Sequence, residues 1–144
     1  MLKIRNQQMQ AFQTVAEVAF LRKLVEYLYE HHGQVAVQLP ENFTVIVQIP
    51  ENQIKTLVAN GINRARAYGI SSEVSLAAFV VLMFVTAPNF DEHPLIKRLL
   101  KDERIAANER IDSLWQHTTE QNWQVVKQNY DAKAWQILGW GNEK

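Results

Sequence analysis

The 144-residue sequence contains no cysteine. This absence excludes disulfide bonds, cysteine-ligated zinc and a thiol nucleophile, although it does not fix the redox compartment in which the chain folds. Fifteen basic and fifteen acidic residues give a formal net charge of zero. The basic excess that is typical of a nucleic-acid-binding protein is therefore missing, and we expect no nucleic-acid partner.

Long apolar runs and a signal for secretion are missing as well. The longest apolar run, Leu76–Val85, is about half of the ~20 residues that a membrane span needs. The N-terminus lacks the apolar core of a signal peptide. The sequence therefore predicts a cytoplasmic protein without a membrane span. Its length and its 47% hydrophobic content are those of a single globular domain.

Most of the chain has apolar residues at steps of three and four, the spacing of amphipathic helices. The expected helices are residues 6–32, 51–68, 73–87 and 94–101, followed after residue 108 by one long helix or by two that meet near residue 120. The segment 73–87 is apolar almost all round, which predicts a buried central helix. The predicted fold class is all-α, a compact bundle of about five helices around that central helix.

Two segments depart from this spacing. In residues 34–50 Phe43, Val45 and Val47 alternate with other residues, which predicts a small β hairpin at 35–49, with a long loop across the helices as the open alternative. The second departure is a tryptophan-containing C-terminal tail at residues 131–144. The predicted organisation is one domain, residues 1–144, that carries this arm and this tail.

Single residues give further expectations. Gly61 lies in the apolar stripe of the second helix, which indicates a close helix crossing, and Gly69 predicts a helix stop in the left-handed conformation. Arg64 lies on the polar face of the same helix and is expected in solvent or in an ion pair with a partner. Trp115 continues a core stripe, and Asn108 is a candidate N-cap of the last helix.

No metal-binding constellation is present in the sequence. The adjacent His31 and His32 would diverge by about 100° on a helix. His93 and His117 are isolated, and the His-Glu-x-x-His spacing of zinc sites is missing. We expect no metal and no other cofactor.

The segment Asp91, Glu92 and His93 is the one candidate for acid–base chemistry. General acid–base catalysis needs a pocket and positioned partners, which the sequence does not indicate. Asp91 fits a turn or a helix cap, with Pro94 at the first helical position. We therefore expect no enzyme, and a small enzyme that uses these three residues is the remaining alternative.

Tryptophans near the end of the chain suggest contact with another protein. Tryptophan is enriched at the energetic centres of interfaces, and chain ends usually fray unless they dock. The candidate partner-binding residues are Trp123, Trp135 and Trp140 and, in the arm, Phe43, Val45 and Val47.

Several short motifs between residues 2 and 115 carry a family resemblance. They are Ile4-Arg5 with Gln8-Met9, the segment Gly61–Ile70, Leu82-Met83, Phe90-Asp91 with Pro94, and Arg110-Ile111-Asp112. This pattern resembles a family of small bacterial proteins encoded beside type VI secretion spike and effector genes. The resemblance implies a non-enzymatic accessory protein or co-chaperone that binds an effector or its adaptor. An immunity protein that neutralises a toxin is the alternative.

Overall fold

Six α-helices form most of the part of the chain that the structure describes, which is residues 2–136, with side chains from residue 16 onward. In this computed structural model they are α1 Leu2–His32, α2 Glu51–Ala67, α3 Glu73–Val85, α4 Pro94–Leu100, α5 Arg110–His117 and α6 Glu120–Gln128. Four short 3-10 turns complete them: η1 Ile46–Gln48, η2 Phe90–Glu92, η3 Ala107–Glu109 and η4 Ala132–Trp135. The predicted all-α fold class is confirmed.

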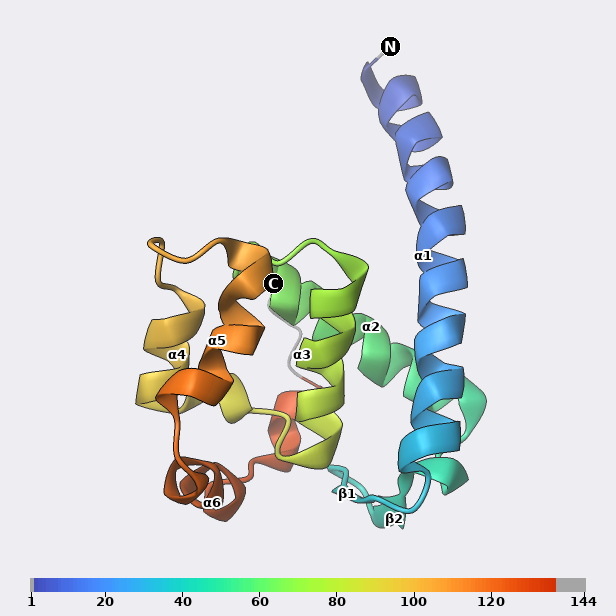
Figure 1. Cartoon of the computed structure of the whole chain (residues 1–144). Helices are drawn as coiled ribbons and strands as arrows, with labels where there is room; N and C mark the ends of the chain where they lie inside the picture. The colour runs from blue at the N-terminus through green and yellow to red at the C-terminus, as the bar shows by residue number, and fades with distance from the viewer. Residues whose placement is uncertain (1, 137–144) are drawn as a thin grey trace.

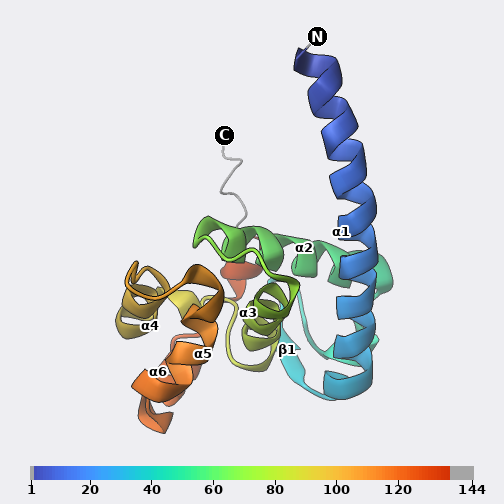
Figure 2. The same cartoon turned by 45° about the horizontal axis from the view of Figure 1, so that its top comes forward.

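The helix α3 is the centre of the fold. It lies between α1 on one side and α4 and α5 on the other, and α2 crosses it (Figures 1 and 2). Phe79 and Val80 are completely buried, because the helix offers apolar side chains to neighbours on several sides. The Ser72 hydroxyl caps the start of α3 by accepting a hydrogen bond from the Ser75 amide at 3.2 Å. The predicted central helix is confirmed.

Two glycines shape α2 as the sequence indicates. A Cβ atom on Gly61 would lie 2.9 Å from Met83 Sδ and 3.0 Å from Val80 Cγ2, so the close crossing of α2 and α3 depends on its missing side chain. Gly69 follows α2 with φ of +91°, a conformation that glycine adopts without steric cost. The Ile70 amide then donates back to the Ala65 carbonyl at 3.4 Å, which completes the predicted helix stop.

The first helix extends far beyond the other described elements (Figure 1). At 31 residues it is about 46 Å long, and it begins earlier than the predicted residue 6. Its C-terminal half packs on the domain, where Leu24, Val25 and Leu28 are buried. Its N-terminal half projects past the other helices (Figures 1 and 2).

The arm after α1 is a hairpin, smaller than the predicted one, and the alternative of a long loop is wrong. Strand β1 (Ala36–Gln38) pairs antiparallel with β2 (Phe43–Val45). The chain then turns into η1, because Ile46, which interrupts the alternating pattern, is fully buried in the core. The Tyr130 hydroxyl accepts from the Gln38 amide at 3.1 Å and donates to the Gln38 carbonyl at 3.0 Å, so it closes the outer edge of β1.

The C-terminal third contains two helices rather than one. Thr119 caps α6 by accepting from the Asn122 amide at 3.2 Å, which is the physical reason for the break near residue 120. The prediction that Asn108 caps the last helix is wrong. Its side-chain oxygen accepts from the amides of Ser71 at 2.8 Å and Ser72 at 2.9 Å, so it holds the start of α3 instead.

Candidate functional site

An apolar groove of about 650 Å³ runs between α1 and α3. It is lined by Phe20, Leu24 and Tyr27 of α1, by Val74, Ala77, Ala78, Val81, Leu82 and Val85 of α3, and by Trp115 of α5. The two charged lining residues, Lys23 and Glu73, come from opposite walls. Small alanines on α3 face long side chains on α1, and this difference in size leaves the hollow.

Large apolar side chains around this groove are exposed to water. Val74 is 82% exposed, Trp115 is 56% exposed and Tyr27 is 45% exposed. Single exposed apolar residues are ordinary on protein surfaces, but a contiguous apolar patch on a monomer marks an interaction site. The prediction that Trp115 lies in the core is therefore wrong. Its ring lines the groove and stacks on Trp123 with centroids 5.5 Å apart.

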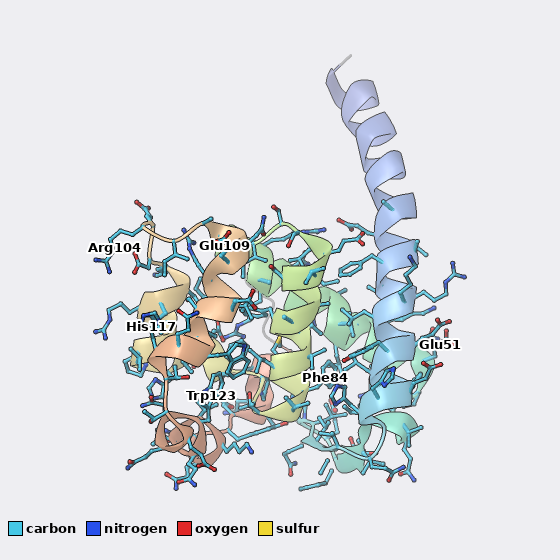
Figure 3. All side chains as sticks on the ribbon, in the orientation of Figure 1. Glu51, Phe84, Arg104, Glu109, His117 and Trp123 are labelled. Carbon is cyan, nitrogen blue, oxygen red and sulfur yellow. The ribbon has the colours of Figure 1, made fainter. Side chains whose placement is uncertain are left out.

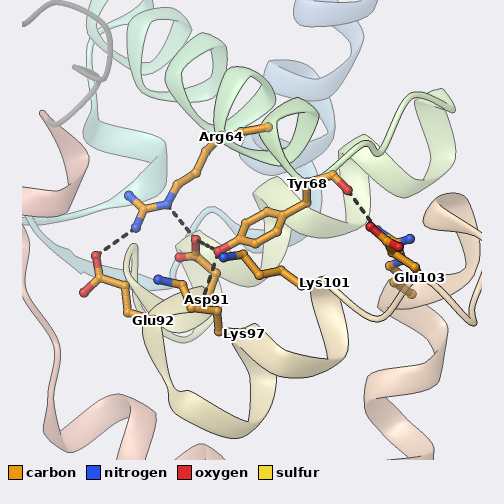
Figure 4. Close-up of a pocket in the computed structure, with 9 residues that line it drawn as sticks. Arg64, Tyr68, Asp91, Glu92, Lys97, Lys101 and Glu103 are labelled. Atoms are coloured by element: carbon orange, nitrogen blue, oxygen red, sulfur yellow. Dashed lines mark hydrogen bonds and ion pairs between the residues drawn. The ribbon is translucent and has the colours of Figure 1, made fainter.

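A second feature is a buried ion cluster between α2 and η2 (Figure 4). Arg64 Nε donates to Asp91 Oδ2 at 2.9 Å, and Arg64 Nη2 donates to Glu92 Oε2 at 3.0 Å. The Tyr68 hydroxyl donates to the same Asp91 oxygen at 2.7 Å. Arg64 is only 8% exposed and Asp91 is 2% exposed. The predicted solvated position of Arg64 is wrong, because the last turns of α2 lie over η2.

Burial and charge set the protonation states in this cluster. Burial raises the pKa of Tyr68 well above its ordinary value, and the Asp91 carboxylate beside it raises this pKa further. Burial alone would lower the pKa of Arg64, but Asp91 and Glu92 more than offset this effect, so the pKa is raised. At neutral pH Tyr68 is therefore a neutral hydrogen-bond donor and Arg64 is a fixed cation.

The cluster borders an open hollow of about 670 Å³ that is also lined by Lys97 of α4 and by Lys101, the residue that follows α4. Arg110, at its edge, donates to the carbonyls of Tyr68 at 3.0 Å, Leu100 at 3.1 Å and Ile105 at 2.9 Å. This guanidinium thus holds the ends of α2 and α4, where a cation is favoured by the helix dipole. Its described hydrogen bonds serve the fold.

The structure does not bring Asp91, Glu92 and His93 together as an acid–base site. Asp91 faces Arg64, whereas His93 Nδ1 accepts from the Leu95 amide at 3.2 Å as the cap of α4. His93 lines a different hollow, beside α6. The expectation that Asp91 is a turn or cap residue is also incomplete, because its carboxylate is the buried partner of an arginine.

The three predicted tryptophans have different positions. Trp123, labelled in Figure 3, is partly buried and stacks on Trp115. Its Nε1 donates to Thr118 Oγ1 at 2.9 Å. Trp135 is 1% exposed and packs on Phe84 with ring centroids 4.7 Å apart, so it has no surface left for a partner here. Trp140 lies outside the described residues.

The three predicted residues of the arm lie away from the groove. Phe43 is 67% exposed and Val47 is 47% exposed, whereas Val45 is partly buried. The groove residues Val74, Trp115 and Tyr27 were not among the predicted contacts. For Val74 the signal in the sequence is the missing polar face of α3, which predicts burial within the chain, whereas Tyr27 and Trp115 lie on α1 and α5.

Three of the motifs that carry the family resemblance meet at the ion cluster. Arg64 and Tyr68 belong to the segment 61–70, Asp91 to the motif Phe90-Asp91 with Pro94, and Arg110 to the motif Arg110-Ile111-Asp112; these residues are joined by the hydrogen bonds given above. The motifs therefore describe how α2, η2 and α5 are fastened together. They do not contribute to the lining of the groove except through Leu82.

Comparisons with protein-family models, with curated proteins and with solved structures found no match. Within residues 2–136 no helix is long and apolar enough to cross a membrane. The described part of the chain also contains no group of three histidine, aspartate or glutamate side chains that could hold a metal ion.

Proposed function

We propose that this chain is a non-enzymatic binding protein whose groove between α1 and α3 receives a helix of a protein partner. In line with the resemblance, the partner is a type VI secretion effector or its adaptor. The observation that supports this proposal is the exposed apolar lining of the groove, above all Val74 and Trp115. Covering the partner's apolar helix would keep it out of water until delivery.

The lining defines the chemistry of the partner. An amphipathic helix that binds in a groove uses apolar anchors at steps of three, four and seven residues. Each buried side chain of valine or leucine size stabilises the complex by about 1.5–3 kcal/mol before the costs of association. Lys23 and Glu73 form no ion pair among the described residues. The bound helix should therefore place an acidic residue beside the α1 wall and a basic residue beside the α3 wall.

Co-purification tests this proposal. The tagged chain is expressed in its native host and isolated together with the effector and adaptor encoded beside it. Ala78→Glu places a charge on the floor of the groove, where an unpaired buried charge is costly, and should abolish the association. Ala106→Glu makes the same change at an exposed loop position and should leave it intact. Circular dichroism confirms that both variants are folded.

Three results would contradict the proposal. The first is that neither protein co-purifies, with normal effector solubility when the gene is deleted. The second is equal capture by the wild type and the Ala78→Glu variant, which would move the contact away from the groove. The third is rescue of cells that express the neighbouring toxin, because neutralisation of toxicity identifies an immunity protein rather than a chaperone.

A further inference from the structure

The projecting half of α1 repeats the apolar pattern of the groove. In the sequence Met9, Phe12 and Ala16 continue, at steps of three and four, the stripe that reaches Phe20 and Leu24 in the groove. This half of the helix extends beyond the other described helices (Figure 1). Helices in water gain most of their stability from packing of an apolar face. The projecting half therefore needs a surface from outside its own fold.

One arrangement covers both unpaired surfaces at once. If a second α1 lies antiparallel on the first, Met9 falls opposite Tyr27, Phe12 opposite Leu24 and Ala16 opposite Phe20. The residue numbers of each pair have the same total, so the three pairs share one register. A two-fold axis at the level of residue 18 relates the two copies, so each pair occurs twice in the dimer, as the symmetry of a homodimer requires.

The charges of α1 favour the same direction. The helix has no acidic residue before Glu17, whereas Lys3 and Arg5 lie near its start and Glu26 and Glu30 near its end. The antiparallel register brings Arg5 of one copy to within one residue of the position opposite Glu30 of the other, twice in each dimer. A parallel pair would set like charges opposite each other and would leave both grooves empty.

From these features we infer that, without its partner, the chain is a homodimer in which the first half of each α1 lies in the groove of the other copy. The inference deepens the proposed function and rests on it in one respect, namely that the partner's helix enters the same groove. The second copy then covers Val74 and Trp115 in the resting state, and a partner helix must displace it.

The mass of the full chain in solution tests this inference. Light scattering after size exclusion should give twice the chain mass of 16.7 kDa. Ala78→Glu should give the monomer mass, and the matched Ala106→Glu should stay dimeric. Because the chain has no cysteine, Ala16→Cys provides a single thiol near the axis that a short bismaleimide should crosslink between copies. Val47→Cys, which lies on η1, should stay uncrosslinked.

Charge reversal tests the direction of the helices. Arg5→Glu and Glu30→Arg should each raise the dissociation constant of the dimer by about tenfold, because each change acts at two symmetric ion pairs. The double variant should restore the wild-type value. Arg22→Glu, which changes the same helix on another face, is the control and should have little effect.

A monomeric wild-type mass at the concentrations used for co-purification would overturn the inference. A dimer that is insensitive to Ala78→Glu, or whose charge reversals do not compensate, would overturn it as well, because its interface would lie elsewhere. These failures differ from a failure of the proposed function. A monomer that still captures its partner through the groove contradicts only the dimer, whereas a groove-mediated dimer that captures nothing contradicts only the partner.

Discussion

Replacing Arg64 by methionine should destabilise the domain far more than its position on a helix surface would indicate. The methionine keeps much of the aliphatic stem but leaves Asp91, which is 2% exposed, with only the Tyr68 hydroxyl as a donor. Asp91 Oδ1 has no hydrogen-bond partner among the described residues, so it cannot compensate. Removing one partner of a buried ion pair costs about 3–5 kcal/mol, a large part of the ~5–15 kcal/mol that stabilises a domain.

A double-mutant cycle isolates this interaction. Asp91→Leu alone should be similarly costly, because it leaves the Arg64 cation buried. The double variant Arg64→Met/Asp91→Leu should recover most of the loss, since an apolar pair of similar volume often replaces a buried ion pair without cost. Glu92→Gln is the control. Its side chain is half exposed, so this arm of the cluster should contribute at most about 1 kcal/mol.

Urea denaturation, followed by circular dichroism at neutral pH, measures each free energy of unfolding. The prediction requires a coupling energy of at least about 2 kcal/mol between the two positions. A loss below about 1 kcal/mol for Arg64→Met, or a double variant as unstable as the sum of the single changes, would refute the idea that this pair fastens α2 to η2.

Two further predictions concern the same helix. The pKa of Tyr68 is raised in the fold. The contribution of Tyr68 to the free energy of unfolding should therefore be constant around neutrality and fall as the pH rises above about 10, where tyrosines of the unfolded chain release protons. Tyr68→Phe should reduce this slope in urea titrations between pH 8 and 11. Gly61→Val should destabilise the fold by about 1–3 kcal/mol through overpacking, since its Cβ would lie 2.9 Å from Met83 Sδ. Asn63→Val on the exposed face of α2 is the control and should change the free energy of unfolding by less than about 0.5 kcal/mol. An equally small change for Gly61→Val would contradict the close crossing of α2 and α3.

Helical spacing and turn chemistry predict most of this fold because they depend on neighbours in the sequence. The bounds of α2 and α4, the stop at Gly69 and the break near residue 120 follow from apolar periodicity, glycine and caps. The errors at Arg64 and Asn108 have a different origin. Each side chain bonds to residues more than 25 positions away, and no local pattern states which segment will lie opposite.

Apolar spacing does not reveal the groove, for a physical reason that also bears on its function. An apolar side chain in the sequence indicates only that the residue is covered from water when the protein functions. The covering residues can belong to the same chain or to another chain. On α3, Phe79 and Val80 are covered by the chain itself, whereas Val74 is 82% exposed, although all three satisfy the same spacing argument. Only the placement of α1 and α5 separates these two groups. Part of the apolar surface of α3 is therefore left uncovered by the helices of its own chain. Ala78→Glu tests what that exposed surface binds. The partner's helix and the second copy are the two proposed ways of covering it.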